Sequence, residues 1–257
     1  MNRIEWRQLK AAEINAFAER NAVVIVPVGS TEQHGPHLPT QVDSLLVHEI
    51  AIRAARQAAA TTPVIVTPTV WSGLAEHHMS LGGTLSLDLT TLLALLRCIC
   101  RSLVRQKFRR ILLLNGHGGN IAALTAIVNE LAVEFDVPIA TTSYWPLARD
   151  AFARILECQK TVRHACEAET SMLLAISPEL VDMSRAVDAV GPTDRELIEV
   201  VGTDAVHRWR SFKSRTRHGV IGDPRTANAE KGHKLFAAAA EAVAKIITNE
   251  EFWTLPA

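Results

Sequence analysis

Carboxylate and imidazole side chains gather in the segment G29-S-T-E-Q-H-G-P-H-L-P-T-Q-V-D43. Glu32 and His34 are two residues apart, so in an extended loop their side chains project to the same side. Asp43 lies at the expected start of a helix, where exposed N–H groups stabilise a carboxylate. One imidazole and two carboxylates form a ligand set suited to Zn, Mn or Fe. The alternative is a polar loop without metal, because the E-x-H pattern often arises by chance.

A glycine-rich turn, L114-N-G-H-G-G-N120, supplies a further candidate ligand. His117 brings the candidates to four, and two carboxylates allow one of them to bridge a pair of metal ions about 3.5–4 Å apart. Such a turn before a helix can instead bind a phosphate through backbone N–H groups. The dinucleotide fingerprint is incomplete, however, because the third glycine and the ribose-binding acidic residue are missing. The absence of G-x-S-x-G also argues against a serine hydrolase.

A third motif, R163-H-A-C-E-A-E-T-S171, opens a helical run. His164 and Glu167 are three residues apart and would share a helix face, whereas Glu169 would point elsewhere. The alternative is that these side chains face solvent and cap the helix. Cys166 stands beside them, but no pair of cysteines forms C-x-x-C, and buried thiols in a reducing compartment are the simpler interpretation.

The elements that must position these residues alternate between apolar runs and helical segments. Alternation of this kind indicates a parallel sheet with crossover helices on both faces. Ligands of such sheets bind outside the carboxyl ends of the strands, and the motifs above fall there, as do His78 after the second strand and Trp145 after the fourth. The expected strands are 22–28, 64–70, 111–114 and 137–144, and the expected helices are 43–60, 88–107, 120–135, 168–176 and 228–248.

Composition predicts a single α/β domain over residues 1–257. Lys plus Arg and Asp plus Glu both number 27, and this balance argues against a nucleic-acid partner, which requires a basic excess. The N-terminus lacks a signal-peptide core and no run suits a membrane helix, so we expect a cytoplasmic protein without membrane association. The basic segment 207–217 is interpreted as a solvated loop or subunit contact, or alternatively as a site that captures an anionic substrate.

Five strings occur in an order similar to that of the creatininase (creatinine amidohydrolase) family and span about residues 23 to 235. The resemblance implies a three-layer α/β/α fold with a mostly parallel central sheet and two divalent metal ions per subunit. It also implies hydrolysis of cyclic amides or related C–N bonds, and a homohexamer. The strings are VPVGSTEQHGPHLPTQVDSLL, GLAEHHMSLGGTLSL, NGHGGN, HACEAETSMLL and GVIGDPRTANAEKG.

The resemblance assigns a role to each matching position. Glu32 and His117 would bind one metal ion, His34 the other, and Asp43 both. His164 would match the family's proton-transfer histidine.

One position departs from creatininase itself, which has a glutamate two residues beyond the turn histidine where this chain has Gly119. Family members with NGHGGN commonly carry a glutamate three residues after the later histidine, which matches Glu167. We therefore expect Glu167 to complete the second metal site or to polarise its water. Cys166, which replaces a small residue, would bring a thiol near the metal.

Three further residues are expected in the substrate pocket. Trp145 would form an aromatic wall, and His37 and His78 would line the pocket or support the metal ligands. The expected activity is hydrolysis of the C–N bond of a small cyclic amide or formamide by a metal-bound water. The alternatives are a peptide- or lactone-cleaving member of the same family, a non-enzymatic metabolite-binding protein, and a nucleotide-binding oxidoreductase.

Overall fold

The computed structural model describes residues 3–192 and 208–254, and its centre is a parallel sheet of four strands. The strands are β1 (Val23–Val28), β2 (Val64–Val66), β3 (Arg110–Asn115) and β4 (Ile139–Ser143), in the spatial order β2-β1-β3-β4. Every residue of β1 is buried, and the strand pairs in parallel with both of its neighbours. Continuous apolar, β-branched runs are typical of strands covered on both faces. The predicted parallel sheet is confirmed, although β2 is shorter than the expected 64–70.

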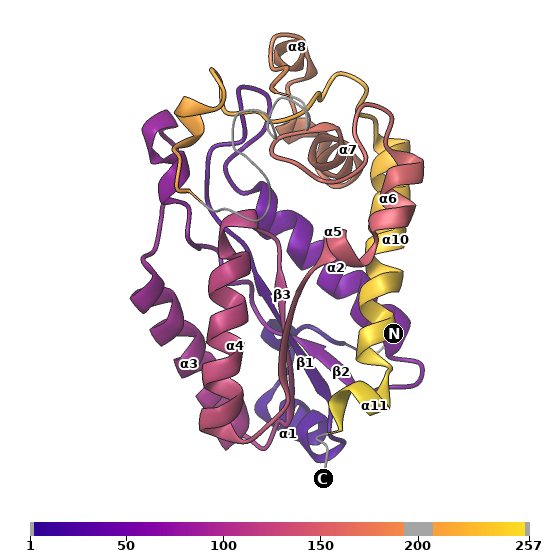
Figure 1. Ribbon diagram of the computed structural model, residues 1–257. Helices are drawn as coiled ribbons and strands as arrows, with labels where there is room; N and C mark the ends of the chain where they lie inside the picture. Colours follow the sequence, from indigo (N-terminus) through magenta and orange to yellow (C-terminus); the bar gives the residue numbers. More distant parts are fainter. Residues whose placement is uncertain (1–2, 193–207, 255–257) are drawn as a thin grey trace.

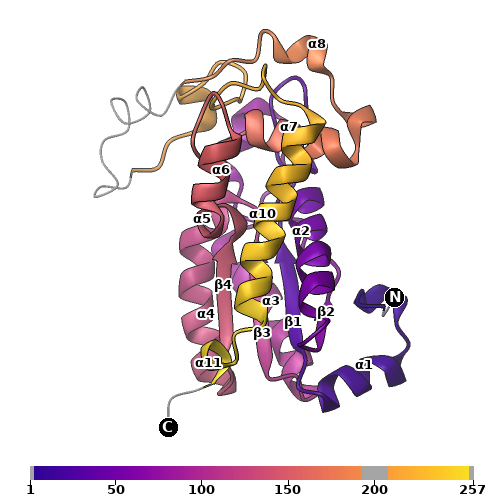
Figure 2. The ribbon, with the colours of Figure 1, turned by 90° about the vertical axis from the view of Figure 1, so that its right-hand side faces the viewer.

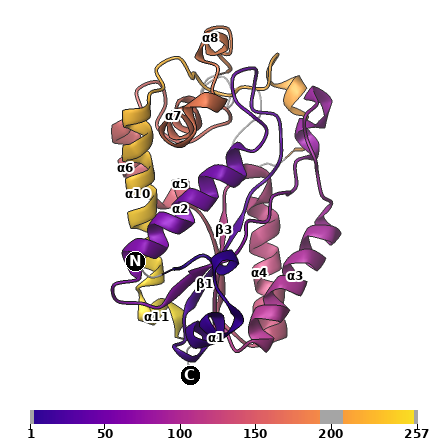
Figure 3. The ribbon, with the colours of Figure 1, turned by 180° about the vertical axis from the view of Figure 1, so that it is seen from behind.

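Helices cover both faces of the sheet, which confirms the three-layer α/β/α prediction (Figures 1 and 3). Side chains of β1 alternate, so that Val23 and Ile25 enter one core and Val24 and Val26 enter the other. The first core is closed by α2 (Val42–Ala58), α7 (Glu167–Ile176) and α10 (Ala229–Ile247), and the second by α3 (Leu89–Arg105) and α4 (Ile121–Phe135).

Shorter elements complete the described chain, and most of them lie where the sequence pattern gave no expected strand or helix. None of the helices in residues 3–192 and 208–254 is long and apolar enough to cross a membrane. The short α-helices are α1 (Ala11–Glu19), α5 (Tyr144–Leu147), α6 (Arg149–Ile155), α8 (Met183–Ala186) and α11 (Glu250–Trp253). The 3-10 helices are η1 (Trp6–Gln8), η2 (Glu76–Leu81), η3 (Gly118–Asn120), η4 (Pro178–Leu180) and η5 (Phe212–Ser214).

Two asparagines of the NGHGGN turn hold the strand-end loops together. Asn115 donates through Nδ2 to the carbonyl of His117 (2.8 Å) and to Oγ of Ser143 (2.9 Å). Asn120 donates to the carbonyl of Gly29 (3.1 Å) and accepts from the N–H of Leu74 (2.9 Å). These buried side chains satisfy backbone groups that the ends of the strands leave unpaired. The loops after β1, β2, β3 and β4 are thereby joined below α7, which lies across that end of the sheet (Figure 2).

Candidate metal centre

Glu32, His34, Asp43 and His117 converge at the carboxyl ends of β1 and β3. Nδ1 of His117 lies 2.9 Å from Oε2 of Glu32 and 3.0 Å from Oδ2 of Asp43. Nε2 of His34 lies 3.2 Å from the other oxygen of Asp43. Asp43 therefore stands between the two imidazoles with one carboxylate oxygen toward each, and all four side chains are buried.

Backbone carbonyls fix the tautomer of both histidines. His117 donates through Nε2 to the carbonyl of Leu74 (3.1 Å), and His34 donates through Nδ1 to the carbonyl of Glu32 (3.1 Å). With those nitrogens protonated, Nδ1 of His117 and Nε2 of His34 direct lone pairs toward the carboxylates. Such supporting hydrogen bonds are characteristic of metal-binding histidines, because they orient the ring and raise its basicity.

Three of the converging atoms are buried and make no hydrogen bond: Oε2 of Glu32, Oδ2 of Asp43 and Nε2 of His34. Buried polar atoms without a partner are rare in folded proteins, and each costs free energy. Donor atoms arranged in this way are satisfied by a cation between them, either a shared proton or a metal ion. The nitrogen and oxygen donors present here fit divalent zinc, manganese or iron.

A fifth ligand candidate is Glu169, and the prediction that named Glu167 in this position needs correction. Oε2 of Glu169 lies 3.8 Å from Nε2 of His34, and the two group with Asp43 as one possible metal-holding cluster. Helix α7 begins only at Glu167, so His164 precedes it and the three-residue helical spacing does not apply. Ala165 has φ 52°, a left-handed turn that redirects the chain between histidine and helix. The helix expected from residue 168 already leaves His164 outside it, but only the conformation of Ala165 decides between Glu167 and Glu169.

Glu167 does not join the cluster, because its carboxylate is bound by other groups. Its carboxylate accepts from the N–H groups of Glu157 (3.0 Å) and Cys158 (2.9 Å), and from Nζ of Lys231 (2.6 Å). No described residue brings Glu167 into a metal-holding cluster. Cys166 is likewise absent from those clusters, and its buried sulfur accepts a hydrogen bond from the N–H of Arg163 (3.3 Å).

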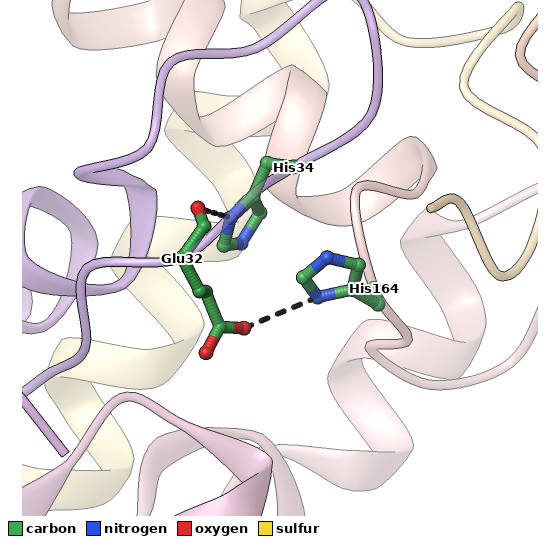
Figure 4. Close-up of side chains that lie close together, drawn as sticks. All are labelled: Glu32, His34 and His164. Atoms are coloured by element: carbon green, nitrogen blue, oxygen red, sulfur yellow. Dashed lines mark hydrogen bonds and ion pairs between the residues drawn. The ribbon is translucent and has the colours of Figure 1, made fainter. Parts of the chain in front are cut away.

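His164 lies beside the cluster. Its Nδ1 is 3.5 Å from Oε1 of Glu32, and its ring stands 4.2 Å from that of His34 between centroids (Figure 4). Its Nε2 donates to the carbonyl of Gln33 (2.7 Å). Burial, followed by the charge of His34, holds the pKa of His164 well below its usual range. The imidazole is therefore neutral, with a lone pair on Nδ1.

A cavity of about 810 Å³ opens onto the cluster. Trp145, His77, His78 and Glu169 all line this cavity. His37 does not line it, because its Nε2 bonds to Oγ1 of Thr170 (3.0 Å) on the far side of α7's first turn.

The cluster has strongly shifted acid–base properties. Burial lowers the pKa of His34, but the carboxylates of Asp43 and Glu169 outweigh it and raise the value to about 9. Burial raises the pKa of Glu169 to about 8. The pKa of Asp43 is lowered, because the two histidines together outweigh the effect of its burial. Groups that share protons so closely are typical of metal and catalytic sites.

The fold is a three-layer α/β/α fold with a parallel sheet, and the buried carboxylate–imidazole cluster at its strand ends is a candidate metal centre. The chain belongs to the creatininase family: the family model described as "Creatininase: Creatinine amidohydrolase" matches residues 7–247. It is thus a creatininase-family hydrolase.

Curated relatives within this family carry different names. The chain is 35% identical over 217 residues to a mycofactocin precursor peptide peptidase of Mycolicibacterium smegmatis, covering 84% of this chain and 80% of the relative. It is 29% identical over 268 residues to a creatinine amidohydrolase of Pseudomonas putida, covering 96% and 95%.

Solved structures of creatininases are similar in fold to this chain. A crystal structure of creatinine amidohydrolase (creatininase) superposes with a TM-score of 0.84 at 26% identity, covering 99% of this chain and all of the other. A structure named "Creatininase Mn" gives 0.83 at 26% identity, covering 98% and 99%.

Proposed function

We propose that this protein is a metal-dependent hydrolase that cleaves an amide bond in a short peptide. The observation that carries the hydrolase proposal is the set of buried, unpartnered ligand atoms of Glu32, His34 and Asp43 beside the cavity. Peptide substrates are favoured over creatinine by the peptidase name of the relative from Mycolicibacterium smegmatis, and the cavity of about 810 Å³ leaves room for a short peptide.

The candidate ligands would divide between two divalent ions, and manganese and zinc are our candidates for these ions. Glu32 and His117 would hold one ion, His34 and Glu169 the other, and Asp43 would contact both through its two oxygens. Bound there, such ions supply a water nucleophile at neutral pH and polarise the amide carbonyl.

His164 is suited to move the proton. Its Nε2–H is engaged by the carbonyl of Gln33, so the neutral ring accepts a proton only at Nδ1, which faces the cluster. In our proposal Nδ1 takes the proton of the attacking water and returns it to the departing amide nitrogen, so that acid and amine leave with no net proton change. Proton transfer by a placed histidine contributes about 10²–10⁴-fold to a rate.

A His164→Ala variant tests this assignment. We expect its metal content to stay at the wild-type level while turnover falls by about 10²–10⁴-fold. Metal analysis beside the rate measurement separates the roles, because loss of metal would make His164 a ligand instead.

A substrate screen with the metal-loaded protein tests the peptide proposal. We expect cleavage of short peptides, and little action on creatinine, formamidopyrimidines or lactones. Hydrolysis of creatinine without peptide cleavage would favour the second candidate, a small-ring amidohydrolase. The aromatic wall formed by Trp145 and the relation to creatinine amidohydrolase support that candidate.

A further inference from the structure

The cavity that reaches the candidate metal centre has a cationic wall. Trp209, Arg210 and Arg215 line it together with the carboxylates and imidazoles of the cluster. They belong to the basic segment 207–217, of which His207 lies outside the described residues. This placement brings the two arginines into the same cavity as the proposed reaction centre.

A single aromatic ring separates the arginines from the centre. The guanidinium of Arg215 lies 5.4 Å from the ring centroid of Phe212. That ring lies 3.9 Å from the ring of His78 and 4.7 Å from that of His164, between centroids. Both imidazoles contact Glu32. Phe212 therefore contacts both the guanidinium of Arg215 and the imidazoles beside Glu32.

Within residues 3–192 and 208–254, neither guanidinium group has a carboxylate partner. Nε of Arg210 and Nε of Arg215 are buried without a hydrogen-bond partner, and Arg215 otherwise donates to the carbonyl of Arg210 (3.0 Å). Among residues 3–192 and 208–254, no carboxylate forms an ion pair with either arginine. Glu76 and Asp88 also line the cavity, and Asp88 is engaged as the N-cap of α3, where it accepts from Thr91.

Two neighbouring cations in a partly buried wall are unfavourable by themselves. Burial lowers the pKa of Arg215, and the charge of Arg210 lowers it further. Partly buried groups of like charge are stabilised when an oxyanion lies between them and accepts from the N–H groups that have no other partner. The planar donor fork of a guanidinium matches carboxylate and phosphate oxygens.

Building on the proposed function, we propose that Arg210 and Arg215 form a subsite for an oxyanion carried by the substrate. The group is a carboxylate or a phosphate, and it lies across Phe212 from the bond that is cleaved. For a peptide, the C-terminal carboxylate on the leaving side supplies such a group.

The test compares three short amide substrates that differ only at one end: a free carboxylate, the matching carboxamide and a phosphate ester. Metal-loaded wild type, R210Q and R215Q are assayed for KM and kcat, and dissociation constants are measured with metal-free protein. Arg208→Gln and Arg217→Gln are the controls, because both arginines are exposed in the same segment and neither lines the cavity.

We expect R210Q and R215Q to raise KM for an anionic substrate about 10- to 100-fold with kcat within about threefold, while the carboxamide and the two controls are unaffected. Preference between carboxylate and phosphate identifies the source of the oxyanion. Equal KM values for acid and amide in wild type would overturn the subsite, as would variants that change only the oligomeric state. Charge-selective binding without hydrolysis would preserve the subsite and refute the proposed function, so the two failures are distinguishable.

Discussion

Two glutamates two residues apart, Glu167 and Glu169, have separate tasks at the start of α7. Glu167 is fully buried and pairs with Lys231 of α10, whereas Glu169 turns toward His34. A helix turns about 100° per residue, so positions two apart face in widely different directions. One carboxylate therefore ties helix to helix, and the other faces the candidate metal centre.

This division predicts opposite effects for a matched pair of substitutions. Glu169→Gln should lower the occupancy of one metal ion and reduce activity by about 10²-fold or more, with thermal stability of the metal-free protein kept. Glu167→Gln should leave the metal content near normal but lower the free energy of unfolding by about 3 kcal/mol, because it leaves the buried Lys231 without its full charge partner. Metal analysis and denaturant unfolding of both variants check this. The reverse pattern would restore Glu167 as the ligand.

Glu32 is the residue on which the hydrolase proposal depends most directly. Its carboxylate touches His117, His78 and His164, so Glu32→Gln removes one charge from the middle of the cluster. We expect loss of one metal ion and of at least about 10²-fold in turnover after reconstitution. Unchanged hydrolysis together with unchanged metal content would contradict the metal centre itself.

Four of the candidate ligands could be predicted from residue types, but the fifth, Glu169 on α7, could not. Glu32, His34, Asp43 and His117 follow strand ends, and the ends of parallel strands meet at one edge. The choice between Glu167 and Glu169 depended on the left-handed residue Ala165, whose conformation no periodicity reveals. His37 shared the loop of His34 but turns away from the cavity, because its partner is Thr170.

At the scale of elements, α7 owes its position to close contact with α10. A Cβ at Gly232 of α10 would overlap the carbonyl of Ser171 in α7, so the two backbones meet there. Ser171 lies two residues beyond Glu169, and the packing of α10 thus determines where that carboxylate stands.

Gly232→Ala should separate the two helices. We expect a loss of about 1–3 kcal/mol in the free energy of unfolding, despite the better helix propensity of alanine, together with weaker binding of metal through displaced Glu169. Denaturant unfolding and metal titration measure the two effects. Glu241→Ala on the same helix is the control, since it removes only the exposed pair with Lys245 and should leave the free energy of unfolding nearly unchanged.

The four strands and five long helices were predictable because their patterns are extended and uninterrupted. The short helices α5 and α6 were not, because four and seven residues hold too few turns for a period to emerge. Their places are set by tertiary packing against α10 rather than by local preference.

At the scale of the whole molecule, the centre collects residues from sequence positions 32 to 169, so it exists only when the sheet, α2 and α7 are assembled. Ligand binding to the folded state alone stabilises that state. The single-domain organisation, the homohexamer and the cytoplasmic location stay predictions.

Stability of the metal-free protein should fall as the pH rises. The pKa of Glu169 is about 8 in the folded protein, against 4.5 for an ordinary glutamate. The stabilisation that its protonated form provides is therefore lost as the pH rises from 4.5 to 8. His34 has a pKa of about 9 against 6.5, so its favourable charge is complete below 6.5 and lost toward 9. Between about pH 6.5 and 8, both groups therefore lower the free energy of unfolding as the pH rises. Thermal melts after chelation should therefore show Tm decreasing over this range.

Metal-loaded protein should behave in the opposite way, because ligands must release their protons before they bind. Its Tm at a fixed metal concentration should increase across the same pH range and exceed that of the chelated protein. A chelated sample that gains stability between pH 6.5 and 8 would contradict the proton-sharing cluster.

The crowding at Gly119 limits how this site can change over evolution. A Cβ there would overlap the carbonyl of Leu74 and Nε2 of His117, the two ends of the hydrogen bond that sets the histidine tautomer. A glutamate introduced at residue 119, where creatininase itself carries one, would disable His117 before it contributed a ligand. Conversion between the two arrangements cannot begin with that single replacement, because the loop of Leu74 must move first. An engineering effort must therefore remodel residues 74–77 before it replaces the glycine.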